Sequence, residues 1–143
     1  IFWGNVQAQI AEGNLLPVEQ MGFGGYNTVR GYDQRSVNGD SGLLLNVELR
    51  TQPTTVLGYS CRTRQCDELQ LLAFYDQGWA YNHSLLPLES RPVDIASVGF
   101  GFRYSLPRSL TLRFDWGWQL TDLPGLNPTT DNSRVHLGVV ATR

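Results

Sequence analysis

Apolar and polar residues alternate with a period of two in six stretches of the chain, whereas helical periodicity is nearly absent. The six stretches are residues 1–12, 42–50, 69–80, 93–105, 109–121 and 134–142. Successive side chains of a β-strand point to opposite faces of the sheet, so each stretch is expected to form a strand with one apolar and one polar face. The pattern predicts an all-β chain of six antiparallel strands.

The expected strands and their connections have the dimensions of a membrane barrel. The strands run about ten residues, the length that crosses a bilayer at a tilt of about 45°. The connections at about 14–41, 82–92 and 122–133 are long, whereas residues 106–109 form a tight turn. Long loops on one side and short turns on the other are typical of transmembrane β-barrels. The connection at about 51–68 breaks this rule and is interpreted as an insertion on the short-turn side.

The polar faces of the strands carry charged residues with small glycines between them. The charged residues are Glu48, Arg50, Asp76, Arg103, Arg113 and Asp115. A soluble sandwich turns its apolar faces into a protein core, whereas a membrane barrel turns them to lipid and lines its lumen with the polar faces. Alternation alone fits both, but the charged polar faces favour the barrel. A soluble β-sandwich binding module, of lectin or lipocalin type, is the more distant alternative.

Aromatic residues recur near the ends of the expected strands. They are Phe2, Trp3, Trp79, Tyr81, Tyr104, Trp116 and Trp118. Aromatic side chains gather at the two membrane–water interfaces of a barrel, so these residues are expected to form girdles.

Six strands do not close a barrel, because known single-chain barrels start at about eight strands. Since the chain begins inside an alternating pattern and without Met, we expect the remaining strands of its own barrel to precede Ile1.

The charge balance and the rare residue types exclude several classes of function. The chain of 143 residues has 11 basic and 13 acidic side chains, and all the basic ones are arginines. This balance lacks the basic footprint of a nucleic-acid-binding protein. The chain contains no run of about 18 apolar residues, so the sequence predicts no transmembrane helix. His83 and His136 lie far apart without catalytic or metal-ligand spacing, so we expect no enzyme activity, no metal and no cofactor.

The two cysteines, Cys61 and Cys66, enclose four residues. This spacing is a poor match to zinc sites, and a second pair of ligands is missing. A short disulfide is the favoured interpretation and implies an oxidising compartment, while two free thiols are the alternative.

The stretch from Gly24 to Gly42 is rich in glycine and carries Arg30 near its middle, in the run Val29-Arg30-Gly31-Tyr32. Glycine permits close approach of the backbone, and the apolar neighbours can pack against a wall. The loop is therefore expected to fold back into the barrel and bring its arginine to an acid.

Asp76 is the expected acid, because it lies on the polar face of the third strand and Gly78, on the same face, leaves space beside it. An arginine and a carboxylate can form two parallel hydrogen bonds. Their raw attraction at 4 Å is about 4 kcal/mol at an effective dielectric near 20. Desolvation leaves a net value of about 1–3 kcal/mol, which biases a loop toward its docked state without fixing it there.

The segments "VRGY", "GDSGLLLNVELR" and "FYDQG" closely resemble the C-terminal part of two-partner secretion transporters (TpsB) of the haemolysin-activator and filamentous-haemagglutinin type. The resemblance covers nearly the whole chain. It implies the last six strands of a sixteen-stranded barrel, with the VRGY loop as the sixth extracellular loop. It also implies that Arg30 contacts Asp76 of the F-x-D-x-G motif formed by Phe74, Asp76 and Gly78.

By this resemblance the chain belongs to a translocator in the outer membrane of a Gram-negative bacterium. The translocator exports a large unfolded passenger protein, its barrel contacts membrane lipid, and its periplasmic POTRA domains are expected outside this chain. The nearest alternative is an outer-membrane barrel-assembly factor of the same superfamily, which inserts other barrels into the membrane.

Overall fold

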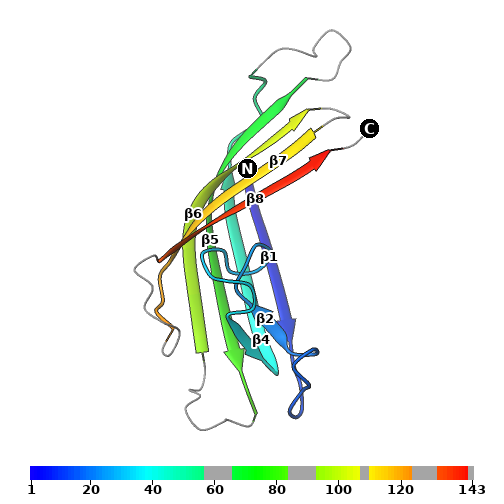
Figure 1. Ribbon diagram of the computed structural model, residues 1–143, viewed down its shortest axis with the longest axis vertical. Coiled ribbons are helices and arrows are strands. Elements are labelled where there is room, and N and C mark those ends of the chain that lie inside the picture. Colours follow the sequence, from blue (N-terminus) through cyan, green and yellow to red (C-terminus); the bar gives the residue numbers. More distant parts are fainter. Residues whose placement is uncertain (57–65, 84–92, 107–109, 124–131, 142–143) are drawn as a thin grey trace.

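The computed structural model describes residues 1–56, 66–83, 93–106, 110–123 and 132–141. Six strands form one antiparallel sheet in the order β1-β4-β5-β6-β7-β8 (Figure 1). Their bounds are β1 Phe2–Gln9, β4 Ser41–Arg50, β5 Glu68–Tyr81, β6 Val93–Leu106, β7 Leu110–Gln119 and β8 Ser133–Ala141. The six predicted strands and their antiparallel order are confirmed. Among the described residues, no helix is long and apolar enough to span a membrane.

One face of the sheet, here called the outer face, exposes a continuous set of large apolar side chains. It includes Phe2, Val6, Leu43, Leu49, Leu71, Tyr75, Val98, Phe100, Val135, Leu137 and Val139. Val6 and Leu137 are 65% and 68% exposed, so in the described part of the chain no second layer covers this face. A soluble β-sandwich would bury these side chains in its core, and the exposed face does not fit that alternative.

The opposite face, here called the inner face, is covered by the segment between β1 and β4. This segment folds back across the sheet instead of extending away from it (Figure 1). Its side chains Phe23, Val29 and Tyr32 are buried in one cluster with Leu44 of β4, Ala80 of β5 and Ile95 of β6. The core of the fragment therefore lies between the sheet and its own loop.

The loop contains a short hairpin that the sequence did not predict. Strands β2 (Met21–Phe23) and β3 (Val37–Gly39) pair antiparallel, with Met21 opposite Gly39. Neither segment was among the six predicted strands, because both lie in the long connection expected at about 14–41. Strands this short leave no periodic pattern to read, and their pairing depends on the folded path of the loop.

Trp3 corrects the expectation of an aromatic girdle at the start of the chain. It pairs with Glu48 across the β1–β4 ladder and, like that residue, points to the inner face, where Arg50 lies 5.1 Å from its ring. Phe2, its neighbour, is exposed on the outer face. Neighbouring residues of a strand cannot share a face, so only one of the two could belong to a girdle.

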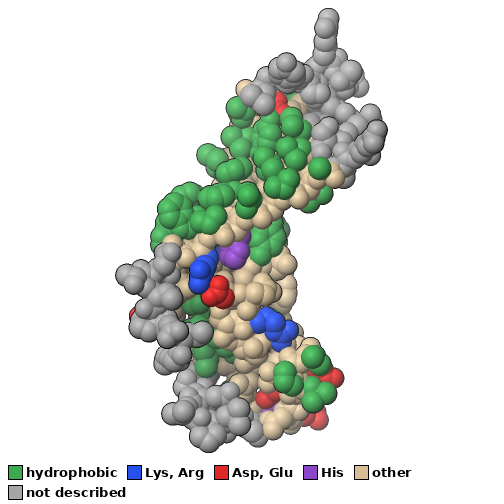
Figure 2. All heavy atoms as spheres, viewed as in Figure 1, with side chains coloured by type: hydrophobic (Ala, Val, Ile, Leu, Met, Phe, Trp, Pro, Cys, Tyr) green, Lys and Arg blue, Asp and Glu red, His purple; other side chains and the backbone are tan. Residues whose placement is uncertain are grey.

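Charged and histidine side chains gather in the middle of the face seen in Figure 2, whereas hydrophobic side chains cover its upper part.

The insertion expected at about 51–68 lies mostly outside the described residues, which omit 57–65 and with them Cys61. Cys66 is disulfide-bonded. Its pairing with Cys61 stays a prediction, as do the conformations of 84–92, 107–109 and 124–131, which lie outside the described residues.

Candidate functional site: an arginine docked on the inner face

The guanidinium of Arg30 reaches Asp76 in the middle of β5. Its Nε and Nη2 donate to the two carboxylate oxygens of Asp76, each at 2.8 Å, and its backbone N–H donates to Oδ2 at 3.1 Å. Arg30 is 2% exposed and Asp76 is fully buried. Within the described residues the pair is therefore shielded from water. Such a two-pronged contact fixes both the position and the orientation of the loop tip.

Two further acids and an aromatic ring complete the surroundings of Arg30. Its Nη1 donates to Glu48 Oε1 at 2.6 Å and lies 3.6 Å from Asp115 Oδ1. The ring of Phe74 lies beneath the guanidinium, with 3.6 Å between Cζ and the ring centroid. The charge of Arg30 is therefore held by acids from β4, β5 and β7 and by an aromatic face.

The backbone of the loop tip approaches the sheet at Gly117 of β7. A Cβ on Gly117 would lie 2.9 Å from the carbonyl carbon of Arg30 and from the nitrogen of Gly31. Gly31 itself has φ of 106°, a conformation that other residues rarely adopt. Gln119 Nε2 donates to the Gly31 carbonyl at 2.7 Å and holds the tip from the next inward position of β7.

The apolar residues of the loop fill space that glycines leave open. A Cβ on Gly78 would meet Phe23 at 2.6 Å and Val29 at 3.2 Å. Tyr32 is buried, and its hydroxyl donates to the Thr121 carbonyl at 2.7 Å and lies 2.9 Å from the Ala96 carbonyl. Val29 and Tyr32, on either side of Arg30 and Gly31, therefore pack against the sheet as apolar anchors of the loop.

Four guanidiniums and three carboxylates form a continuous network on the inner face. Besides the contacts of Arg30, Arg50 Nη2 lies 2.6 Å from Glu48 Oε2, and Arg103 Nη2 and Arg113 Nε each lie 2.9 Å from Asp115. The six charged residues expected on the polar faces therefore belong to the same network as Arg30. Asp115 lies opposite Gly101, whose missing side chain leaves room for the carboxylate.

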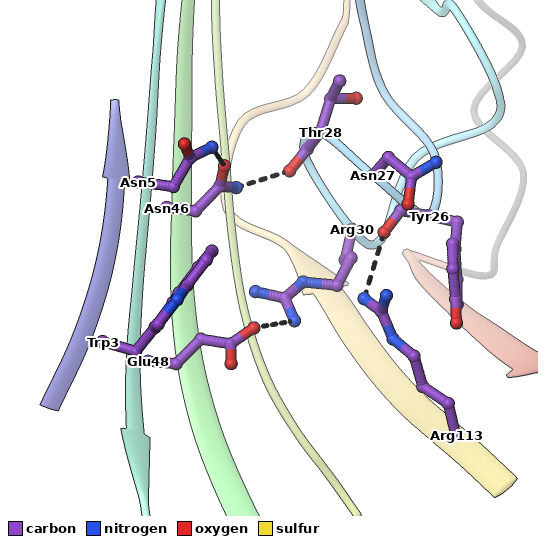
Figure 3. A pocket seen from close by; sticks show the side chains of 9 residues that line it. All are labelled: Trp3, Asn5, Tyr26, Asn27, Thr28, Arg30, Asn46, Glu48 and Arg113. Carbon is purple, nitrogen blue, oxygen red and sulfur yellow. Dashed lines mark hydrogen bonds and ion pairs between the residues drawn. The ribbon is translucent and has the colours of Figure 1, made fainter. Parts of the chain in front are cut away.

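A small cavity of about 140 Å³ lies between the loop and the first strands. It is lined by Trp3, Asn5, Tyr26, Asn27, Thr28, Arg30, Asn46, Glu48 and Arg113 (Figure 3). Asn46 connects its walls, because its amide donates to the Thr28 carbonyl at 2.7 Å and to Asp76 Oδ1 at 2.8 Å. In the described ranges no group of three His, Cys, Asp or Glu side chains is placed to hold a metal ion.

A carboxylate outside this network, Asp40, connects the two ends of the loop just before β4. Its Oδ1 accepts from Leu15 N at 2.9 Å and Gln20 Nε2 at 3.0 Å, and its Oδ2 accepts from His83 N at 2.9 Å. These hydrogen bonds lower the pKa of the Asp40 carboxyl below its usual value, and the hydrogen bond from Gln20 has the largest effect. Asp40 belongs to the G-D-x-G segment noted in the sequence, but its bonding partners lie up to 43 positions away.

Several residues that hold the loop were not singled out from the sequence. They are Phe23, Tyr26, Asn46, Asp40 and Gln119. Asn46 and Gln119 do stand on the polar faces of their strands, which is the only signal that could have indicated them. A polar residue on an inward face is common in barrels, so this signal does not separate a loop contact from an ordinary lining residue.

The geometry defines a segment of barrel wall with an apolar outer face and a charged inner face that its own loop occupies. Residues 1–104 match the family described as haemolysin secretion/activation protein ShlB/FhaC/HecB, and the chain belongs to this family. The match includes the VRGY loop and strands β1, β4 and β5, while β7 and β8 lie beyond it. Neither the curated proteins nor the solved structures gave a match.

Membership in this family confirms the resemblance drawn from the VRGY and F-x-D-x-G segments. The family consists of transporters of two-partner secretion in the outer membrane of Gram-negative bacteria and is not a family of enzymes. The described sheet fits part of the β-barrel of such a transporter.

Proposed function

We propose that this chain is the C-terminal barrel part of an outer-membrane translocator that exports a large unfolded passenger protein. The observation that carries the proposal is the docking of Arg30 against Asp76, Glu48 and Phe74 on the inner face of a family barrel sheet. The docked loop ties β4, β5 and β7 together and acts as a strut or switch that holds the pore in its transport-competent arrangement. Because only a few charged contacts attach it, the loop can shift between a docked and a released state.

The outer face supports a position in the bilayer, where its exposed leucines, valines and aromatic residues contact lipid. In the described part of the chain, no strand pairs with the outer edges of β1 and β8, and further strands are needed because hydrocarbon does not satisfy open backbone groups. We propose that these strands belong to the same protein and complete a sixteen-stranded barrel with POTRA domains on its periplasmic side.

The roles of the site residues follow from their contacts. Arg30 is the charged tip of the loop, and Asp76 is the acceptor that fixes its orientation. Glu48 and Asp115 balance the surrounding guanidiniums, and Gly78 admits the apolar anchors of the loop. None of these groups is proposed to react chemically, since the task is to hold and release a loop.

The test is Arg30→Ala in the full-length transporter, expressed in its native host from which the transporter gene has been removed. The passenger is the protein that disappears from the culture medium when the transporter is removed. We expect Arg30→Ala to lower its secretion while the barrel still reaches the membrane and stays folded in detergent. Breaking a buried ion pair from one side costs about 3–5 kcal/mol, enough to change the docked population completely.

Arg134→Ala is the matched control, because its ion pair with Asp33 is largely exposed and should contribute little. Secretion by Arg30→Ala at the wild-type level would contradict the proposal. A general loss of outer-membrane barrels on removal of the transporter, with no change in the culture medium, would favour the barrel-assembly alternative instead.

A further inference from the structure

Tyr26 holds the loop at a second place, on β7 and β8, whereas Asp76 lies on β5. Its ring lies against the guanidinium of Arg113 on β7, with 3.7 Å between Arg113 Cζ and the ring centroid. Arg113 Nη2 also points to the carbonyl of Tyr26 at 3.4 Å (Figure 3). On its other side, the ring meets His136 of β8 edge-on, at a centroid distance of 5.9 Å.

The fit of Tyr26 depends on Gly138 of β8. A Cβ added to Gly138 would lie 2.9 Å from the Tyr26 hydroxyl, which is tighter than ordinary contacts, and 3.6 Å from Tyr26 Cζ, which is ordinary. Arg113 is opposite Gly138 in the β7–β8 ladder. The place that holds the Tyr26 ring, here called its seat, is therefore formed by one pair of facing residues, Arg113 and Gly138. The seat is formed by residues that lie far from the VRGY run in sequence.

The seat of Tyr26 is connected to the site of Arg30 through one carboxylate. Arg113 Nε donates to Asp115 Oδ2 at 2.9 Å, and Asp115 Oδ1 lies 3.6 Å from Arg30 Nη1. Withdrawal of the Tyr26 ring would leave Arg113 free to reorient, and this would alter the charge balance around Arg30. The two contacts are therefore expected to support each other.

We propose that Tyr26 is a positioning residue, a second latch that fastens the VRGY loop to β7 and β8 and sets how often the loop leaves the inner face. The inference rests on the proposed function and adds the regulation of the same loop. The aromatic face, not the hydroxyl, provides the attachment, because Arg113 and His136 both contact the ring. The hydroxyl only limits how close β8 can come.

The test measures amide hydrogen exchange of the loop peptide covering residues 24–32 in the full-length transporter in detergent. Tyr26→Ala should speed exchange of this peptide on the order of tenfold, from the loss of one partly desolvated cation–π contact. Tyr26→Phe should stay within about twofold of the wild type, because the ring remains. Exchange of the β5 and β6 peptides should not change, which separates loop release from a general loss of structure.

Gly138→Ala provides a second perturbation in which the aromatic ring stays in place. It should speed exchange of the loop peptide, and Tyr26→Phe in the same chain should reverse much of that effect by removing the clashing hydroxyl. Gly4→Ala is the matched control, because a Cβ there would meet only ordinary contacts at 3.8 Å or more. The control should leave the exchange of the loop peptide unchanged.

Wild-type exchange in Tyr26→Ala, equal effects of Phe and Ala, or no reversal in the Tyr26→Phe/Gly138→Ala double variant would each overturn the latch. If these arms fail while Arg30→Ala still blocks secretion, the latch is wrong and the proposed function stands. If the exchange results hold while Arg30→Ala secretes normally, the latch stands and the proposed role of the loop in secretion is wrong.

Discussion

Gly117 of β7 lies directly beneath the main chain of Arg30, so close that a Cβ at this position would sit 2.9 Å from the Arg30 carbonyl carbon. The atoms in the way belong to the backbone and not to the end of a flexible side chain. A single strand position therefore controls whether the loop tip can reach the depth at which Arg30 meets Asp76.

The first prediction is that Gly117→Ala prevents full docking of the loop while the strand still forms. The added methyl group should lift the Arg30–Gly31 backbone and lengthen the contacts of the guanidinium. Overpacking of this kind costs about 1–3 kcal/mol. Protection of the Val29–Tyr32 amides in hydrogen exchange should fall accordingly. Gly4→Ala, which meets no close atoms, should leave it intact. An unaltered exchange rate in Gly117→Ala would show that the tip does not depend on this approach.

The second prediction concerns Glu48, which accepts from Arg30 Nη1 at 2.6 Å and from Arg50 Nε at 2.7 Å. Glu48→Gln keeps the shape but leaves two guanidiniums without their shared negative charge, so the docked loop should lose about 3–5 kcal/mol. Adding Arg50→Gln should restore part of this loss, because one unbalanced charge is removed. Protease resistance of the loop in detergent-solubilised transporter measures both variants.

Glu68→Gln at the exposed start of β5 is the matched control for Glu48→Gln and should change resistance little. A double variant no more resistant than Glu48→Gln would argue that shape, and not charge balance, connects these residues.

The third prediction is a pH dependence that originates at Asp40. Hydrogen bonds lower the pKa of its carboxyl in the folded protein, so the ionised form stabilises the attachment of the loop ends. This stabilisation is fully present above the ordinary aspartate pKa of about 4. It is lost as the pH falls through the lowered pKa of the folded state.

Asp40→Asn separates this effect from other acids, because its amide group would face the donating N–H of His83. The difference in thermal stability between wild type and Asp40→Asn should be constant from neutral pH down to about 4. Below that it should shrink. A difference that grows on acidification would contradict the assignment to Asp40.

Strand positions and faces were predictable because they depend on a local property. In residues 110–120, the apolar side chains at even positions alternate with the polar or small residues at odd positions. A period of two places the two sets on opposite faces, whatever the neighbouring strands do. The same rule placed Glu48, Asp76 and Asp115 together on the inner side. Trp3 was misassigned because its place near a strand end suggested a girdle, although its alternation with Phe2 already set it on the polar side.

The Arg30–Asp76 pairing was expected from the resemblance and from the glycine beside the acid, not from the strands alone. The partners beyond it required the ladder registers. Glu48 stands next to Phe74, and Asp115 next to Gly101, only because strands β4 to β7 pair as they do. A shift of one residue in any of these ladders would turn a whole row of side chains to the other face.

The sequence by itself determined which residues form the six strands of the sheet, which side of each of these strands is apolar and which loop carries the VRGY arginine. Only the tertiary structure decided that this loop contacts four of these strands at once, with Tyr26 on β7 and β8 and Arg30 on β4 and β5. The reason is physical: alternation is encoded within about ten residues. Contacts between residues 46 to 110 positions apart depend on register, on sheet curvature and on the space that Gly78, Gly117 and Gly138 leave open.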